Sequence, residues 1–297
     1  MNHMIRVYDR KHKTYFEEKV VGESLIKFVY ENPLGKPLLF FIKRKFFSAL
    51  YGSAMDSKPS RRMIDGFIRD NGIDMKESLL PASAFKTFNE FFIRTLKPDA
   101  RPCDMSSNVL ISPADSRLLA FQDLNVQTLL QVKGLTYSLS ELVADKELAN
   151  SYAGGTALVF RLCPLDYHRF HFVDSGIPGS PRQMTGIYHS VNPIALRRIP
   201  RLYVENKRSL TAVESDHFGK ILYVEVGAMN VGSILQTFKP GLWVKKAEEK
   251  GYFKFGGSTV ILFLEKGQVR IHDDILTLSR EGTESRVLFG ESIGEGL

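Results

Sequence analysis

The stretch Tyr252–Leu264 reads YFKFGGSTVILFL and joins a glycine pair to an unbroken apolar run. A short apolar run that follows turn residues is typical of a β-strand, so we expect a strand over Thr259–Glu265. The glycines can take backbone conformations that are closed to other residues. An attack of the Ser258 hydroxyl on the carbonyl of Gly257 would need that freedom, although a plain hairpin turn explains the same letters.

Similar apolar runs recur along the second part of the chain and are separated by Gly, Pro, Asp or Asn. They are rich in Val, Ile, Leu and Phe, and we expect strands at Arg117–Phe121, Thr156–Cys163, Gln183–His189, Lys220–Ala228 and Gln268–Ile271. These runs predict a β-rich, mostly antiparallel core over residues 106–297.

The first part of the chain has helical spacing instead. Apolar residues recur at three and four positions in Gly22–Asn32, Lys36–Tyr51, Ser60–Asn71 and Ala84–Thr95. We therefore expect a helical region over residues 1–105 and an α+β fold overall. The segment Lys36–Tyr51 mixes Phe and Leu with Lys and Arg. This mixture fits either an amphipathic helix in a membrane interface or a helix packed on the core.

The bulk composition narrows the class of protein. The 297 residues are 43% hydrophobic and carry a formal net charge of +7, so a folded chain with an anionic partner is expected. No nucleic-acid-binding signature is visible, which favours an acidic membrane surface over nucleic acid. We see no signal peptide and no apolar run of the roughly 18 residues that span a bilayer. Cys103 and Cys163 are expected to be free thiols.

Two further segments place reactive side chains beside apolar strands. Asp115 stands in the turn SPADSR, where it could orient a histidine or cap its own backbone. His168 and His171 lie three residues apart in DYHRFH. They could serve chemistry or make ordinary hydrogen bonds, and no third ligand supports a metal site.

Taken together and in order, these motifs resemble those of the phosphatidylserine decarboxylase family. The resemblance runs from about Tyr8 to the C-terminus. Its segments are FNEFFIRTLKPDARP (Phe88–Pro102), SPADSR (Ser112–Arg117), DYHRFHF (Asp166–Phe172), SVNPIAL (Ser190–Leu196), EVGAMNVGSI (Glu225–Ile234) and FKFGGST (Phe253–Thr259). Two departures affect loops: Ser116 stands where many relatives have Gly, and no Pro follows His171 closely.

The resemblance implies a role for four residues. Ser258 corresponds to the family's self-processing serine, and Asp115 and His171 correspond to its triad partners. His168 resembles a histidine assigned to decarboxylation. Cleavage between Gly257 and Ser258 would give a β chain, 1–257, and an α chain, 258–297, whose first residue becomes a covalent pyruvoyl cofactor.

The same resemblance implies the reaction and the partners. Phosphatidylserine would be decarboxylated to phosphatidylethanolamine and CO₂ through a Schiff base with the pyruvoyl group. The expected setting is the cytoplasmic side of the cell membrane, bound peripherally, with a homodimer of β/α heterodimers. Three alternatives stay open: a serine hydrolase that uses Ser258, His171 and Asp115, a basic nucleic-acid-binding module, and a pyruvoyl decarboxylase of a soluble amino acid.

Overall fold

One large sheet dominates the computed structural model, which describes residues 5–132, 135–229 and 234–297. In this part of the chain ten strands form the sheet. In spatial order they are β10 (Arg182–Met184), β11 (Arg208–Ser215), β12 (Lys220–Val226), β15 (Ser258–Leu264), β7 (Thr156–Leu162), β4 (Ser116–Phe121), β17 (Glu284–Val287), β1 (Arg6–Asp9) and β2 (Thr14–Glu17), and β9 (Gly176–Pro178) pairs with β11. Neighbouring strands are antiparallel except β1 and β17, which are parallel. The predicted α+β fold with a mostly antiparallel core is confirmed.

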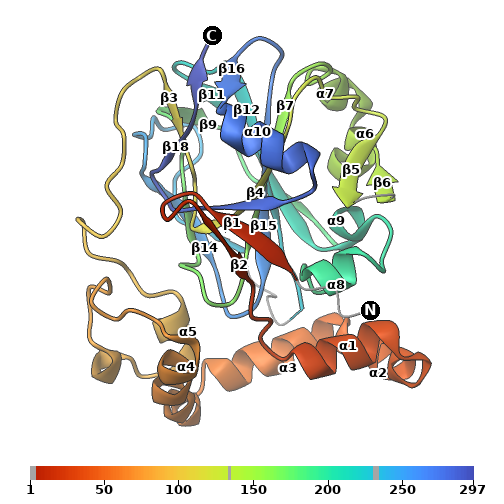
Figure 1. Ribbon diagram of the computed structural model, residues 1–297, viewed down its shortest axis with the longest axis vertical. Coiled ribbons are helices and arrows are strands. Elements are labelled where there is room, and N and C mark those ends of the chain that lie inside the picture. Colours follow the sequence, from red (N-terminus) through yellow and green to blue (C-terminus); the bar gives the residue numbers. More distant parts are fainter. Residues whose placement is uncertain (1–4, 133–134, 230–233) are drawn as a thin grey trace.

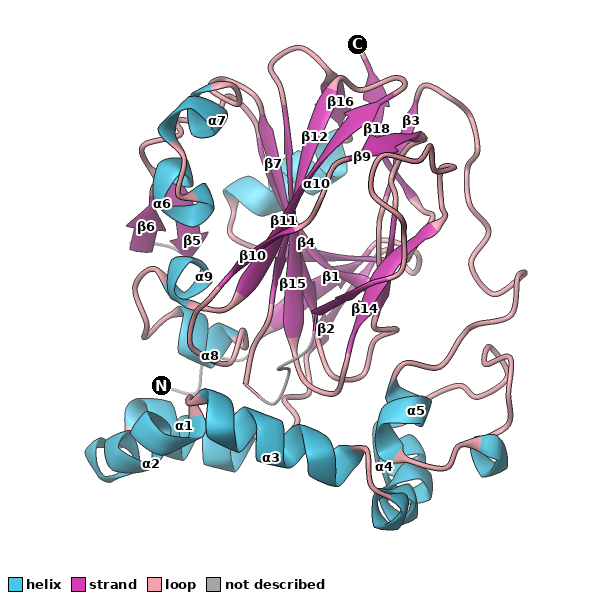
Figure 2. Ribbon diagram, turned by 180° about the vertical axis from the view of Figure 1, so that it is seen from behind, coloured by secondary structure: helices cyan, strands magenta, loops and turns pink. Residues whose placement is uncertain are grey.

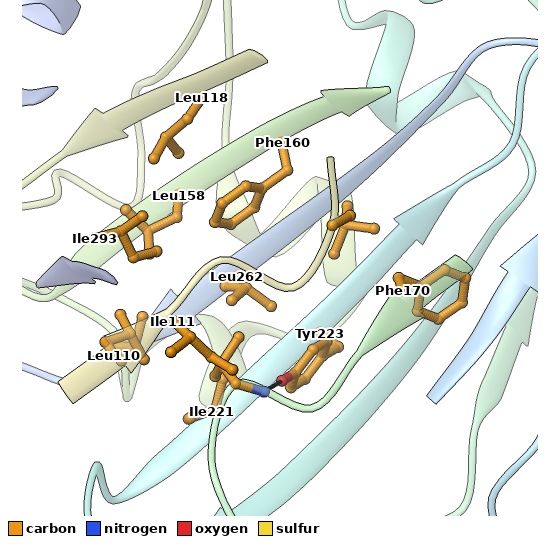
Figure 3. Packing of buried hydrophobic residues seen from close by; sticks show 14 of the residues in the cluster. Leu110, Ile111, Leu118, Leu158, Phe160, Phe170, Ile221, Tyr223, Leu262 and Ile293 are labelled. Carbon is orange, nitrogen blue, oxygen red and sulfur yellow. Dashed lines mark hydrogen bonds between the residues drawn. The ribbon is translucent and has the colours of Figure 1, made fainter. Parts of the chain in front are cut away.

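Strand β15 lies in the interior of this sheet, between β12 and β7. Every residue of β15 is buried. Val260, Leu262 and Leu264 belong to one apolar cluster, whereas Ile261 and Phe263 belong to a second cluster on the other face. Figure 3 shows Leu262 among the packed residues of the first cluster. Because both faces are covered, the strand reads as a continuous apolar run rather than an alternating one.

Each face of the large sheet has its own covering layer (Figure 2). On one face, the first cluster includes residues of two small sheets and a helix: β8 (Arg169–His171), β13 (Ile234–Gln236), β14 (Glu249–Phe253), β3 (Val109–Ile111), β16 (Val269–Ile271), β18 (Ser292–Gly296) and α10 (Asp273–Arg280). On the other face, the second cluster includes residues of β5 (Leu129–Val132), β6 (Leu135–Tyr137), α6 (Leu139–Val143), α7 (Lys146–Asn150), α8 (Pro193–Leu196) and α9 (Leu202–Glu205).

The remaining helices gather at one end of the molecule (Figure 1). They are α1 (Glu23–Glu31), α2 (Lys36–Ile42), α3 (Lys45–Met55), α4 (Ile64–Asn71) and α5 (Phe88–Phe92). Helix α5 packs on Phe255, whose ring centroid lies 4.8 Å from that of Phe88 and 4.9 Å from that of Phe92. Asn89 Oδ1 also accepts a hydrogen bond from the Phe255 backbone N–H. The helical end therefore holds the segment that leads into Ser258.

Two predicted helices are shorter than the spacing suggested. The segment Lys36–Tyr51 contains two helices rather than one, because Arg44 takes an extended conformation (φ −86°, ψ 147°) between α2 and α3. Within Ala84–Thr95 the α-helix is limited to α5, and Ala84 ends a short 3₁₀ helix. Thr87 caps the start of α5 by accepting a hydrogen bond from the Glu90 backbone N–H, so the helix begins after it.

The predicted strand Gln183–His189 is also too long, since the antiparallel ladder with β11 ends at Met184 and is followed by an isolated parallel bridge between Ile187 and Asn206. A Cβ atom on Gly186 would lie 2.4 Å from the Glu205 carbonyl oxygen, so the chain passes too close to α9 to continue the ladder. It then turns toward the helices, where the Tyr188 backbone N–H donates to the Lys43 carbonyl. Strands β1 and β2, which join the sheet from within residues 1–105, were not predicted.

Candidate active site

Ser258 is the first residue of β15 and is completely buried. Its Oγ atom lies 3.5 Å from Nδ1 of His168, a residue in the turn that precedes β8. The Ser258 Cα is paired with that of Leu162 on β7, so the sheet fixes the serine on the side of the first apolar cluster. The structure therefore places the predicted self-processing serine in reach of one imidazole.

His168 is held in a single orientation. Its Nε2 atom lies 2.9 Å from the Cys163 carbonyl oxygen, and its ring stacks on Phe92 with centroids 4.1 Å apart. A carbonyl oxygen can only accept a hydrogen bond, so Nε2 carries the proton and Nδ1 is left as the acceptor that faces Ser258. Burial lowers the pKa of His168 to about 3. At neutral pH the imidazole is thus a neutral base aimed at the serine hydroxyl.

His171 lies on β8 in a different environment. Its ring stacks on Phe289 with centroids 3.6 Å apart and on Tyr167 at 5.8 Å. Its Nδ1 atom lies 3.3 Å from the Pro113 carbonyl oxygen, which makes Nδ1 the protonated nitrogen. Burial lowers its pKa to about 3 as well. His171, the predicted triad partner of Ser258, is therefore also neutral. Its hydrogen bond and ring contacts, however, are with Pro113, Phe289 and Tyr167.

Asp115 is buried in the turn before β4 and is tied to an arginine. Arg101 donates from Nε at 3.0 Å and from a terminal nitrogen at 2.7 Å, which is the bidentate geometry of a strong ion pair. The Phe289 backbone N–H donates a third bond to the carboxylate at 2.9 Å. Because the Phe289 ring stacks on His171, this residue is the link between Asp115 and His171. In the described residues no direct hydrogen bond joins the two.

The backbone just before Ser258 adopts a conformation that favours glycine, as the glycine pair in the sequence indicated. Gly256 has a φ of +138°, in a region that favours glycine. Gly257 lies close to Val191, whose side chain would be 3.3 Å from a Cβ atom at that position. A cavity of about 40 Å³ adjoins Gly257 and is lined in part by Ser190 and Asn192. That volume has room for a water molecule beside the predicted cleavage site.

A buried ion pair lies on the same face of the sheet as Ser258. Lys250 of β14 and Glu225 of β12 are fully buried, with Nζ 2.7 Å from Oε1. Lys250 also bonds Gln236 and Thr211 and lies near four aromatic rings. Burial lowers the pKa of Lys250, whereas the Glu225 carboxylate opposes that effect.

Sequence reasoning missed three contributors to the site: Arg101, Phe92 and Phe289. Arg101 and Phe92 lie within the segment Phe88–Pro102, which was identified as a family motif. The sequence did not indicate which residues these two side chains contact. No local signal points to Phe289, which reaches the site by tertiary packing. Residues 230–233 of the predicted segment Glu225–Ile234 lie outside the described residues. Cys103 and Cys163 are free thiols, as predicted.

The site is thus that of an α+β enzyme with a buried serine, a neutral histidine and a glycine pair at a strand start. The profile of the phosphatidylserine decarboxylase family matches residues 88–295. The chain is 52% identical over 295 residues to the phosphatidylserine decarboxylase proenzyme of Clostridium novyi (strain NT), covering 99% of this chain and 100% of that protein. It is 51% identical over 292 residues to proteins of the same name from Clostridium botulinum (strain Alaska E43 / Type E3) and Clostridium perfringens (strain ATCC 13124), covering 98% of this chain and 99% of each.

The chain belongs to the phosphatidylserine decarboxylase family, as the motifs predicted. It is accordingly an enzyme of the decarboxylase class.

Proposed function

We propose that this enzyme decarboxylates phosphatidylserine with a pyruvoyl group that it makes from Ser258 by cutting its own chain after Gly257. The main support is the buried contact between Ser258 Oγ and an imidazole nitrogen, next to a glycine pair. The relatives named above carry the word proenzyme in their names, which fits a chain that matures after synthesis.

The proposed maturation begins when Ser258 Oγ loses its proton and attacks the Gly257 carbonyl carbon. The C–N bond between the two residues breaks and an ester forms in its place. β-Elimination then releases the upstream chain with a Gly257 carboxylate and leaves dehydroalanine at position 258. Hydrolysis of its imine tautomer consumes water and releases ammonia, which leaves the pyruvoyl group. The small cavity beside Gly257 is where we expect that water to bind.

The two histidines have separate roles in this proposal. His168 already faces position 258, so we assign it to the proton that must return to the substrate α-carbon after CO₂ leaves; its neutral Nδ1 would first take that proton from the substrate ammonium group as the Schiff base forms. His171, with Asp115, is assigned to maturation through the family resemblance and the logic of a Ser-His-Asp triad. The contact in this structure favours a different first base, because His168 is the imidazole in reach of Ser258 Oγ. Substitutions can separate the two assignments.

Position 258 suits a pyruvoyl group because its side chain is fully buried and its backbone is paired with Leu162 of β7. Such a carbonyl would supply an electrophile for the substrate amine and a sink for the electrons released on loss of CO₂. The protein's own part is to exclude water around residue 258 and to keep the His168 ring in place through Phe92 and the Cys163 carbonyl.

A lipid substrate requires access from a membrane, and helices α1–α3 offer a surface for it. Their exposed large apolar side chains are Leu25, Phe28, Leu38, Phe40, Phe41, Phe46, Phe47 and Leu50, with Leu34 in the connecting turn. Lys43 and Arg44 lie between α2 and α3 and Lys45 begins α3, and these three can attract anionic lipid at about 1 kcal/mol each. Within the described residues, no helix combines the length and the apolar character needed to cross a bilayer.

We therefore propose that helices α1–α3 lie in the membrane interface, on the cytoplasmic side of the cell membrane. These helices also contact the loop near Gly257, because Tyr30 of α1 accepts a hydrogen bond from the Ser190 backbone N–H. A homodimer of processed chains remains a prediction from the family.

The test is the intact mass of the purified protein, with activity measured on phosphatidylserine vesicles. The expected result is two chains, 1–257 and 258–297, with a carbonyl-blocked N-terminus on the smaller one. A Ser258→Ala variant should stay whole and inactive. Thr259→Val, a matched change at the next buried hydroxyl, should be cut normally.

Activity from an uncut chain would contradict the pyruvoyl mechanism and favour the serine hydrolase or another chemistry. A cut chain that decarboxylates a soluble amino acid but not vesicles would contradict the lipid substrate.

A further inference from the structure

Arg94, two residues after helix α5, is a buried cation that forms no ion pair with the residues that the structure describes. Only 7% of its surface is exposed. Its Nε atom has no hydrogen-bond partner among the described residues, and its Cζ atom lies 5.1 Å from the ring centroid of Phe91. Burial lowers the pKa of Arg94, because its charge has lost the solvation of water. A guanidinium in this state is a strong candidate to bind an anion.

Arg94 lines a cavity of about 310 Å³ that also contacts the β1–β2 turn, the residues after α4 and the Asp115 turn. Three further arginines line the cavity, and each is paired: Arg101 with Asp115 and Glu77, Arg117 with Glu18 and Asp166, and Arg286 with Asp9. In the described part of the chain, Arg94 is therefore the arginine of this wall that has no carboxylate within ion-pair distance, although the more distant carboxylates of Asp115 and Glu77 partly oppose the lowering of its pKa.

The carboxylates of the cavity wall are occupied by groups of the protein. Asp9, Glu77, Asp115 and Asp166 bond the arginines just named, and Glu291 bonds Arg10. Asp74 accepts a hydrogen bond from the Lys76 backbone N–H. A cation in the cavity would compete with an arginine at every one of these carboxylates except Asp74. An anion at Arg94 would displace nothing.

We propose that this cavity binds a small anion through carboxylate or phosphate oxygens, with Arg94 as the principal donor. The planar fork of a guanidinium matches two oxygens of such a group. The volume is at the lower end of ligand pockets, which suits inorganic phosphate or a phosphate ester of headgroup size. Lys11, on the exposed turn between β1 and β2, adds a positive group to the wall. The site does not require any chemistry at Ser258.

The first experiment is calorimetric titration of the full-length protein with inorganic phosphate, against chloride at equal ionic strength. Wild type should bind phosphate and unfold at a higher temperature in its presence. Arg94→Gln should weaken binding by about tenfold or more, which is the cost of losing a charged hydrogen-bond donor. Arg94→Lys should fall between the two. Arg286→Gln, which changes a paired arginine of the same wall, should bind close to wild type.

Absence of both phosphate binding and thermal stabilisation in wild type would overturn the proposal, and so would equal binding by the Arg94 variants. Circular dichroism would show whether a variant fails to fold. Even then, the wild-type measurement tests whether the cavity binds phosphate.

A second arm separates the sources of the anion. Water-soluble glycerophosphoserine that displaces phosphate, together with competitive inhibition of decarboxylation by phosphate, would identify a lipid headgroup as the ligand. Phosphate binding without either effect would identify a free anion. Both outcomes support the site, and both are independent of whether the chain forms a pyruvoyl group.

Discussion

The Oγ atom of Ser258 lies 3.5 Å from Nδ1 of His168, and both side chains are completely buried. The hydrogen bond between His168 Nε2 and the Cys163 carbonyl determines which nitrogen faces the serine. A neutral acceptor aimed at a hydroxyl is suited to removing the Ser258 proton, and the same bare nitrogen could later carry a proton to the substrate. His168 is therefore the first residue to substitute.

We expect His168→Ala to be cut into two chains but to lose decarboxylation by about 10²-fold or more, the usual effect of removing a general acid or base. His171→Ala should stay uncut. Intact mass at fixed times after synthesis and release of CO₂ from vesicles measure the two properties. His189→Ala, a third buried histidine, serves as the control. An uncut His168→Ala together with a normally cut His171→Ala would reassign maturation to His168.

Two buried histidines of the site, His168 and His171, contribute to the pH dependence of stability, and His189, whose pKa burial lowers to about 4, adds to it. The pKa values of His168 and His171 are lowered from 6.5 to about 3, so the folded protein leaves them neutral where the unfolded chain protonates them. Stability is therefore full above pH 6.5 and falls as pH drops toward 3, by about 1.4 kcal/mol per pH unit for each histidine. Urea unfolding of the Ser258→Ala chain between pH 7 and pH 4 measures this slope. His168→Gln should make it shallower, and an unchanged slope would contradict the assignment.

The ion pair between Arg101 and Asp115 should be needed for the site to keep its shape. Asp115→Asn leaves a largely buried arginine with one exposed partner, Glu77, and we expect slow or absent cleavage with a loss of about 3–5 kcal/mol. Arg101→Gln should act in the same direction. Glu77→Gln changes only the exposed partner and should be cut at the wild-type rate. Cleavage time courses measure the effect on maturation, and denaturant unfolding measures the effect on stability. Normal cleavage in Arg101→Gln would contradict the prediction.

The buried pair of Lys250 and Glu225 should contribute to stability only as a pair. Lys250→Met leaves the Glu225 carboxylate buried without its cation, and we expect about 3–5 kcal/mol of destabilisation. Adding Glu225→Gln removes the orphaned charge and should recover most of that loss. Chemical unfolding of both variants in the Ser258→Ala background makes the comparison. Equal stability of the single and double variants would show that the pair is not coupled.

Membrane binding should depend on the exposed face of α2 and α3. Replacing Phe40 and Phe46 by Ser removes two half-exposed or exposed aromatic side chains with little effect on the core, since they are 50% and 70% exposed. We expect weaker sedimentation with anionic vesicles and a higher KM for vesicle substrate, with unchanged chain cleavage. Phe88→Ser, at a buried position on α5, is the contrasting control and should destabilise the fold. Undiminished vesicle binding by the Phe40 and Phe46 variant would contradict the proposed surface.

The sequence by itself determined the local features of the chain. The unbroken apolar run after Ser258 predicts a strand, and the buried strand β15 confirms it. Strands β4, β7 and β12 and most of α1 were also predicted, because the spacing of apolar residues along a short segment indicates a strand or a helix. The boundaries within Lys36–Tyr51, Ala84–Thr95 and Gln183–His189 were wrong. They depend on contacts with segments far along the chain, such as the approach of Gly186 to α9.

The motifs also named the residues that gather at the site, but only the tertiary structure decided which of them meet. Ser258 and His168 are 90 residues apart in the chain. They come into contact because β15 pairs with β7 and because Phe92 of α5 stacks on the imidazole. Arg94 and Asp115 share a cavity wall for a similar reason. Sequence patterns record the local preferences of the backbone and the burial of side chains. Distances of a few ångströms between remote side chains arise from the packing of the whole fold.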